Sequence, residues 1–204
     1  MSAQTRKLAA IVYTDLARFS ELSATDETRA IELVNLQREI IHPIIDNYNG
    51  TLHKETGDGF LLTFSTVTSA VEFAIEFQRA IKNIDGLNVR IGIHEGEITV
   101  QNNDIFGDDV NVGSRIEPYS PVGGIAISDK VQREISSLAE YKTELIGEPE
   151  LKGIKQPVKI YCISSHNMAV PTEKSEKPAS AHKKQRFNFN VLNLTGITLT
   201  IIGG

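Results

Sequence analysis

Residues 51–65, TLHKETGDGFLLTFS, carry the pattern from which the fold class follows. Two strand-like runs flank Thr56-Gly57-Asp58-Gly59, and an Asp-Gly pair between such runs is a strong signal for a β-hairpin. Nearer the N-terminus, Leu8–Thr14 (LAAIVYT) is a continuous, β-branched apolar run that ends in Asp15. Such a run is typical of a buried strand. We therefore expect a strand and a hairpin in one sheet.

Helical patterns lie on both sides of the hairpin. A capping box at residues 23–26 predicts a helix that runs to Asn49-Gly50, with Pro43 expected to kink or interrupt it. A second helix is expected where apolar residues follow helical spacing from Val67 to Ile81. Residues 87–100 then indicate a strand in which glycines mark a bend or a bulge.

The rest of the chain continues this alternation. We expect helices over 107–117 and 129–136, and strands over 123–128, 141–146 and 158–163. Strands separated by helices, with hairpins between them, predict an α+β fold of the ferredoxin-like kind, a single mixed sheet covered by helices.

Composition narrows the class of protein without defining its chemistry. The 204 residues include 21 Lys and Arg and 26 Asp and Glu, a net charge of −5, which argues against sequence-independent binding to nucleic acid. A lone cysteine, Cys162, excludes an internal disulfide and any cysteine-cluster metal site. The N-terminus lacks the apolar stretch of a signal peptide. We expect a cytoplasmic protein.

The charge is unevenly distributed along the chain. Residues 167–204 hold five basic and two acidic residues, which leaves a net −8 on residues 1–166. We therefore expect one folded domain, the part that would carry any catalytic activity, over residues 1–166. A polar basic linker is expected over 167–186 and an uncharged tail over 187–204. The tail could be disordered, form an extra strand, or begin a membrane segment of a longer, membrane-attached protein. Membrane contact is expected only through this tail.

Two aspartates stand where a metal ion could bind. Asp15 ends the first strand, and Asp58 lies at the tip of the hairpin, so both project from one sheet edge if the two elements are neighbours. Two close carboxylates repel each other unless a cation lies between them, and a shared Mg²⁺ or Mn²⁺ would account for both. The alternative is simpler: an Asp-Gly pair often forms only a turn, and an aspartate after a strand is often a cap.

Six segments in order resemble the class III nucleotidyl cyclase catalytic domain, the adenylate/guanylate cyclase family, over about residues 8–163. They are TDLARFS (14–20), KETGDGFLLTF (54–64), VRIGIHEGE (89–97), DIFGDDVNVGSRIE (104–117), GGIAISD (123–129) and ELKGIKQPVKIY (150–161). The resemblance implies a ferredoxin-like α+β fold and dimers with the active site between subunits. It also implies formation of a cyclic nucleotide with two divalent ions, Mg²⁺ or Mn²⁺.

The resemblance assigns metal and phosphate roles to the first segments. Asp15 and Asp58 match the family's two metal-binding aspartates, and the backbone carbonyl of Leu16 would be a further ligand. The turn over residues 16–20, which includes Phe19 and Ser20, would place backbone N–H groups near the triphosphate. Arg18 stands where many relatives have glycine, which leaves the local turn uncertain, although a cation there could also touch phosphate.

Lys54 and Asp104 match the positions that select the base. Lysine can only donate and suits N1 of adenine, whereas a carboxylate accepts from the N6 amino group. Guanine reverses this pattern, and guanylate cyclases that resemble this chain have an acid in place of the lysine. Without the resemblance, Lys54 would be an exposed strand lysine beside Glu55.

Asn111 and Arg115 are four residues apart and so share one helix face. They match the family's asparagine and arginine that orient the ribose and stabilise charge on the reacting phosphate. Otherwise Arg115 would simply pair with Asp108 or Glu117. Lys155 lies near the family's lysine for the terminal phosphates, and Lys152 competes for that role.

Because one chain holds every role, the resemblance favours a homodimeric adenylate cyclase with ATP as substrate. Two alternatives are a non-catalytic cyclase-like domain that binds nucleotide or a partner, and a guanylate cyclase. Loss of a metal aspartate or of the phosphate arginine is the usual mark of the former, and this chain retains them.

Overall fold

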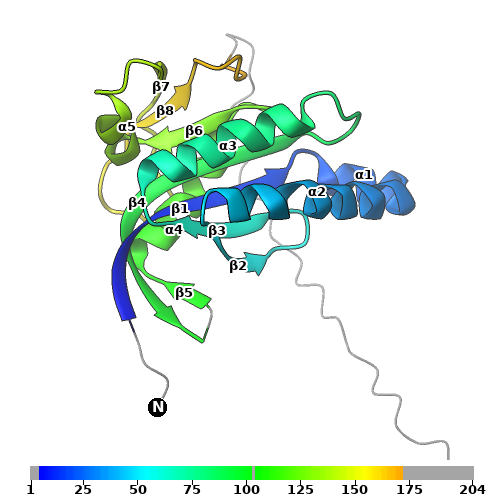
Figure 1. Cartoon of the computed structure of the whole chain (residues 1–204), viewed down its shortest axis with the longest axis horizontal. Coiled ribbons are helices and arrows are strands. Elements are labelled where there is room, and N and C mark those ends of the chain that lie inside the picture. Colours follow the sequence, from blue (N-terminus) through cyan, green and yellow to red (C-terminus); the bar gives the residue numbers. More distant parts are fainter. Residues whose placement is uncertain (1–4, 103, 172–204) are drawn as a thin grey trace, which may run out of the picture.

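A computed structural model describes residues 5–102 and 104–171 (Figure 1). The predicted tail, and the predicted linker from residue 172 onward, lie outside the described residues. The elements in chain order are β1 (Thr5–Leu16), α1 (Phe19–Thr25), α2 (Glu27–Asn47), β2 (Thr51–Glu55), β3 (Phe60–Phe64), α3 (Val67–Ile81), β4 (Val89–Gln101), β5 (Asp104–Phe106), α4 (Asp108–Ile116), a 3₁₀ turn (Glu117–Tyr119), β6 (Ile125–Ser128), α5 (Asp129–Ile135), β7 (Thr143–Gly147) and β8 (Ile160–Ile163).

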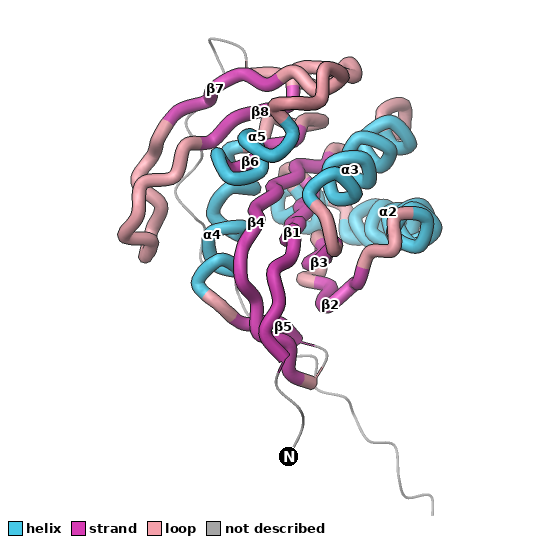
Figure 2. The backbone as a smooth tube through the Cα atoms, turned by 60° about the vertical axis from the view of Figure 1, so that its left-hand side comes forward, coloured by secondary structure: helices cyan, strands magenta, loops and turns pink. Residues whose placement is uncertain are grey.

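These strands form one mixed sheet of eight strands in the order β2-β3-β1-β4-β6-β8-β7, with β5 paired to β4. The β4–β6 pair is parallel, and the other pairs are antiparallel. Figure 2 shows α2 and α3 on one side of β1 and β4, and α4 on the other. The predicted α+β architecture of a mixed sheet covered by helices is confirmed.

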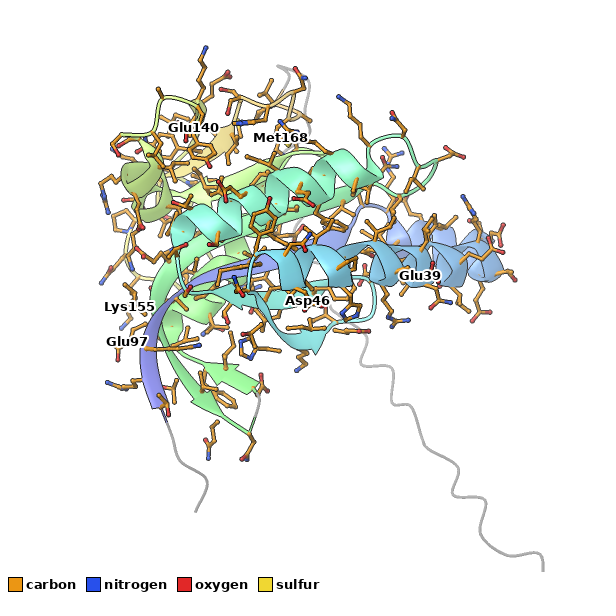
Figure 3. All side chains as sticks on the ribbon, viewed as in Figure 1. Glu39, Asp46, Glu97, Glu140, Lys155 and Met168 are labelled. Atoms are coloured by element: carbon orange, nitrogen blue, oxygen red, sulfur yellow. The ribbon has the colours of Figure 1, made fainter. Side chains whose placement is uncertain are left out.

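The two faces of β1 are buried by different helices. Ala10 and Val12 belong to the main core with α2 and α3. Ala9 and Ile11 point the other way and pack with Val110 of α4, because successive side chains of a strand alternate between faces. The main core also includes Met168, two residues into the predicted linker (Figure 3). Within the described residues, no helix is both long and apolar enough to cross a membrane.

The first helical region differs from the prediction. The expected capping box at residues 23–26 is wrong, because Ser23 lies inside the short helix α1 and the long helix α2 begins only at Glu27. The side chain of Asp26 accepts from the backbone N–H of Arg29 at 2.9 Å and caps α2. Pro43 does not interrupt α2. It lies on the exposed face, where water can bind the carbonyl of Glu39 that loses its donor.

Of the predicted bend or bulge in the strand after residue 87, the bulge is absent from the pairing of β4 with β1, while both strands curve together (Figure 2). All twelve residues of β1 pair with β4 in one unbroken register, from Thr5 opposite Val100 to Leu16 opposite Val89. Because these glycines have no side chain, neighbouring backbone and side chains can pack directly against β4. A Cβ on Gly92 would lie 2.5 Å from the backbone nitrogen of Glu117, and one on Gly96 would overlap the Asp109 carboxylate.

A glycine also allows the hairpin tip to reach the end of β1. The backbone N–H of Leu16 donates to the carbonyl of Asp58 at 3.2 Å, and that of Phe60 donates to Oγ1 of Thr14 at 3.0 Å. A Cβ on Gly59 would overlap the carbonyl oxygen of Thr14. The close approach of these two segments therefore requires glycine at position 59.

Gly59→Ala is expected to lower the free energy of unfolding by about 3 kcal/mol, because the added methyl group forces the hairpin away from β1. Urea unfolding followed by circular dichroism measures the change. Gly57→Asn is the comparison: the φ of 93° at Gly57 strains any residue with a Cβ, but a side chain there has open space, so the loss is expected to be about 1 kcal/mol. Equal losses in both variants would contradict the close approach.

Candidate functional site

The two predicted metal aspartates are brought together at one edge of the sheet. β1 pairs antiparallel with β3, so the end of β1 with Asp15 lies beside the hairpin tip with Asp58. The hydrogen bond from Leu16 to the Asp58 carbonyl fixes this neighbourhood. Both aspartates are half-buried. The predicted proximity of strand and hairpin is confirmed.

The donor set at this edge fits a hard divalent cation. Two carboxylates and the backbone carbonyl of Leu16 offer oxygen ligands only, which Mg²⁺ and Mn²⁺ prefer. Within residues 5–102 and 104–171, no group of three or more His, Cys, Asp or Glu could hold a metal ion. Asp15 and Asp58 would therefore be supplemented by water and substrate phosphates, which is how Mg²⁺ usually binds at nucleotide sites.

The turn after β1 keeps a conformation that glycine adopts readily. Arg18 has φ 62° and ψ 22°, in the left-handed region, at a cost of about 1 kcal/mol for a residue with a Cβ. It precedes α1, which begins at Phe19 and receives no side-chain cap from Arg18. A turn therefore forms here with arginine in place of glycine, and the phosphate role of the Phe19 and Ser20 amides stays a prediction.

A hollow of about 390 Å³ lies between β2, β5 and α4, and it brings Lys54 and Asp104 together. Its lining consists of Tyr13, Lys54, Thr56, Leu61, Asp104, Ile105 and Val110. Apolar walls with a few polar groups are typical of sites for flat organic ligands such as a purine. Lys54 and Asp104 of one chain thus line the same hollow, and their base-selecting role stays a prediction.

Lys54 is directed into this hollow by an irregularity in the hairpin. The register between β2 and β3 shifts between Leu52 and Lys54, so that Lys54 pairs with Leu61. His53, at the shift, shares a hydrogen bond of 2.8 Å with Oγ1 of Thr63. A bulge of this kind re-aims the side chains that follow it.

Tyr13 is a lining residue that the sequence analysis does not identify. It shares one face of β1 with Asp15, and the alternation of the strand is the signal that could have found it. Burial raises the pKa of Tyr13 to about 12, the charge of Asp104 adds to this, and the Arg115 guanidinium opposes it. The hydroxyl therefore lies within electrostatic reach of two predicted site residues and stays protonated at neutral pH.

α4 presents Asn111 and Arg115 beside the hollow. Gly113 lies between them against the ring of Tyr13, where a Cβ would be 3.2 Å from the ring carbons, so the helix approaches β1 closely. Asn111 is exposed and Arg115 is half-buried. The Nε of Arg115 is buried and has no hydrogen-bond partner among the described residues. A buried donor without a partner is costly, and an anionic ligand would satisfy it.

Lys155 lies apart from the hollow. It is exposed on the loop between β7 and β8, as is Lys152 (Figure 3). Leu151 and Val158 of this loop pack against Ile116 of α4, and neither lysine is among the residues that line the hollow. Because both lysines are exposed, their burial does not separate them, and the assignment of Lys155 to the terminal phosphates stays a prediction.

Comparison with known proteins identifies related sequences and folds. A family model described as the adenylate and guanylate cyclase catalytic domain matches residues 1–165. A relative from Rhizobium meliloti (strain 1021), named "Putative adenylate cyclase 3", is 34% identical over 172 residues, which cover 80% of this chain and 29% of the relative. The chain thus spans less than a third of that relative's length.

Two solved structures are similar over most of the chain. The adenylate/guanylate cyclase/hydrolase from Silicibacter pomeroyi has a TM-score of 0.69 at 32% identity, covering 79% of this chain and 98% of that one. The adenylyl cyclase CyaB from P. aeruginosa has a TM-score of 0.72 at 25% identity, covering 87% and 100%.

Proposed function

The chain belongs to the adenylate and guanylate cyclase catalytic domain family, and on this premise we propose that it converts ATP to 3′,5′-cyclic AMP and pyrophosphate. The observation that carries the choice of ATP is that Lys54 and Asp104 line the same hollow. A lysine donor and a carboxylate acceptor together match the Watson–Crick edge of adenine and mismatch that of guanine.

The proposed reaction is an in-line attack by the ribose 3′-oxygen on the α-phosphate, in which each site residue has a separate role. Asn111 would orient the ribose, and the planar guanidinium of Arg115 would stabilise the charge that develops on the reacting phosphate. The amides of Phe19 and Ser20 would hold the triphosphate, with Lys155 at its far end. Held by Asp15, Asp58 and the Leu16 carbonyl, two Mg²⁺ or Mn²⁺ would lower the pKa of the 3′-hydroxyl and neutralise phosphate charge.

The proposal includes a symmetric homodimer with two sites at its interface. Asp15 and Asp58 of one subunit would act with Lys54, Asp104, Asn111 and Arg115 of its partner. A two-fold axis then generates the second site from the same surfaces. We place this activity in the cytoplasm, which agrees with a buried, unpaired Cys162.

A non-catalytic role is less well supported. The buried Nε of Arg115 and the neighbouring aspartates at the sheet edge are what a catalytic domain needs, and a domain that only binds a partner would not need both. A guanylate cyclase is opposed by Lys54 and Asp104.

The test of the function is a product assay. The purified full chain is incubated with ATP or with GTP and Mn²⁺, and cyclic nucleotide is quantified, with EDTA as the metal-free control. Cyclic AMP is expected to exceed cyclic GMP, and EDTA is expected to abolish both. No cyclic product from either nucleotide would contradict a catalytic role.

The double substitution Lys54→Glu with Asp104→Ser is expected to lower the ratio of kcat/KM for ATP over GTP by about 100-fold. Glutamate can accept from N1–H of guanine and serine can donate to O6, whereas adenine loses both partners. The ratio is measured from initial rates with each nucleotide. Lys82→Glu is the control: it makes the same lysine-to-glutamate change at an exposed position after α3 and should leave the ratio unchanged. An unchanged ratio in the double variant would remove the base-selecting role.

A further inference from the structure

A gap in the sheet lies beside the middle of β4, along the edge that does not pair with β1. At this edge, β6 pairs with residues 91–93 of β4, and β5 pairs with residues 99–101. Between them, among the described residues, no strand pairs with that edge of β4. The carboxylate of Asp109, from the first turn of α4, fills this gap: its Oδ2 accepts from the backbone N–H of Glu97 at 2.9 Å.

Two side chains donate to the other carboxylate oxygen. Nε2 of His94 lies 3.0 Å and Nζ of Lys130 lies 3.1 Å from Oδ1 of Asp109. His94 belongs to β4 and is 2% exposed, whereas Lys130 belongs to α5. Asp109 therefore joins α4 to β4 and α5 through three hydrogen bonds.

The protonation of this cluster follows from its burial. Burial lowers the pKa of His94, so the ring is neutral. Burial alone would raise the pKa of Asp109, but hydrogen bonds from His94 and Lys130 outweigh it and hold that pKa below its usual value. Because an ionised carboxylate can only accept, the proton of His94 is on Nε2.

The chain is shaped to receive this carboxylate. A Cβ on Gly96 would overlap the side chain of Asp109, so only glycine lets α4 come this close to β4. Gly107, which precedes α4, has no side chain with which to cap it. The start of α4 is thus fixed by Asp109 against β4, and its middle by Gly113 against Tyr13 of β1.

We propose that Asp109, held by His94 and Lys130, is a positioning residue that sets where Asn111 and Arg115 stand over the reacting phosphate. Asn111 follows it by two residues on the same short helix, and Arg115 by six. The inference rests on the proposed function. Because the base contacts come from β2 and β5, a displaced α4 should impair kcat more than the KM for ATP.

The main test is steady-state kinetics of full-chain variants with ATP and Mn²⁺. Asp109→Ala is expected to lower kcat by about 50-fold with a change in KM of less than about threefold, since small displacements of reacting groups are costly. Asp109→Asn is expected to keep kcat within about fivefold of the wild type. Its amide oxygen can accept from Glu97 and its NH2 group can donate to the other tautomer of His94, so that only the contact with Lys130 is lost.

A matched control separates positioning from stability. Thr66 caps α3 on the opposite face of the sheet, where its Oγ1 accepts from the backbone N–H of Ser69 at 3.1 Å. Thr66→Ala is expected to lower Tm by about 3 °C and to leave kcat unchanged. Unchanged kcat in Asp109→Ala, equal loss in Asp109→Asn and Asp109→Ala, or equal loss in Thr66→Ala would each overturn the inference.

Lys130→Ala covers the case in which Asp109→Ala fails to fold. It removes one of the three donors from an exposed position and is expected to lower kcat about threefold at unchanged KM. An unchanged kcat there would overturn the inference as well. A wild-type chain that makes no cyclic nucleotide would instead contradict the proposed function, so the two failures are distinguishable.

Discussion

Asp58→Ala is expected to lower the rate of cyclic AMP formation at least about 1000-fold while the protein stays folded. The change removes one of the two carboxylates that offer oxygen ligands at the sheet edge. It spares the backbone carbonyl of Asp58, which accepts the hydrogen bond from Leu16. The fold of the hairpin should therefore survive, and the loss should fall on metal binding. Initial rates with ATP and Mn²⁺ give the size of the effect.

Thermal unfolding with added Mn²⁺ and ATP provides a readout that does not depend on turnover. Mn²⁺ and ATP together are expected to raise the Tm of the wild type and to raise that of Asp58→Ala much less. A ligand that binds the folded protein with a larger Kd stabilises it less at the same concentration. Asp46→Ala is the control, since Asp46 is an exposed aspartate on α2 (Figure 3). A fully active Asp58→Ala protein would contradict the metal assignment and the catalytic proposal with it.

Mixing Asp58→Ala with Arg115→Ala is expected to restore activity to about a quarter of the wild-type rate. Each variant alone should be almost inactive, because each site lacks either a metal ligand or the phosphate arginine. Random reassociation makes about half of the dimers mixed, and one of the two sites in a mixed dimer regains every group. The rate is measured after the subunits have exchanged.

The control mixture combines two defects from the same half of the site. Asp58→Ala with Asp15→Ala should recover no activity, since every mixed dimer still lacks one metal aspartate at each site. Recovery in this mixture would indicate contamination or reversion. Absence of recovery with Arg115→Ala would show that each site is built within one chain, and would end the homodimer proposal.

Local sequence patterns predicted the elements whose signals do not depend on distant contacts. The Asp-Gly hairpin at residues 57–59 and the apolar spacing of α3 are of this kind, and both are confirmed. The start of α2 is different, because Ser23 and Asp26 are both good capping residues. Only the observed backbone shows that the amide of Arg29 is bound by Asp26.

The glycines of β4 form no bulge against β1, for a related reason. A glycine inside a strand predicts either a bulge or a close neighbour, and the sequence does not contain the neighbour. At Gly96 the neighbour is Asp109, which comes from a helix that begins twelve residues further on.

The candidate site was predictable as a list of residues but not as an arrangement. The resemblance named Lys54 and Asp104, and the strand pairing brings them to one hollow. It did not name Tyr13, although strand alternation places that residue on the same side as Asp15. It favoured Lys155 over Lys152 for the terminal phosphates, and because both are exposed on one loop that assignment stays a prediction.

The unbroken pairing of β1 with β4 has a consequence for how the domain can change in evolution. A slip of one residue along this ribbon would turn Tyr13 and Asp15 together to the opposite face. A lining residue of the hollow and one of the two proposed metal ligands would then be lost in one event, while the strand itself kept its hydrogen bonds. Insertions and deletions are thus excluded from the paired strands β1 and β4 and confined to the loops around them.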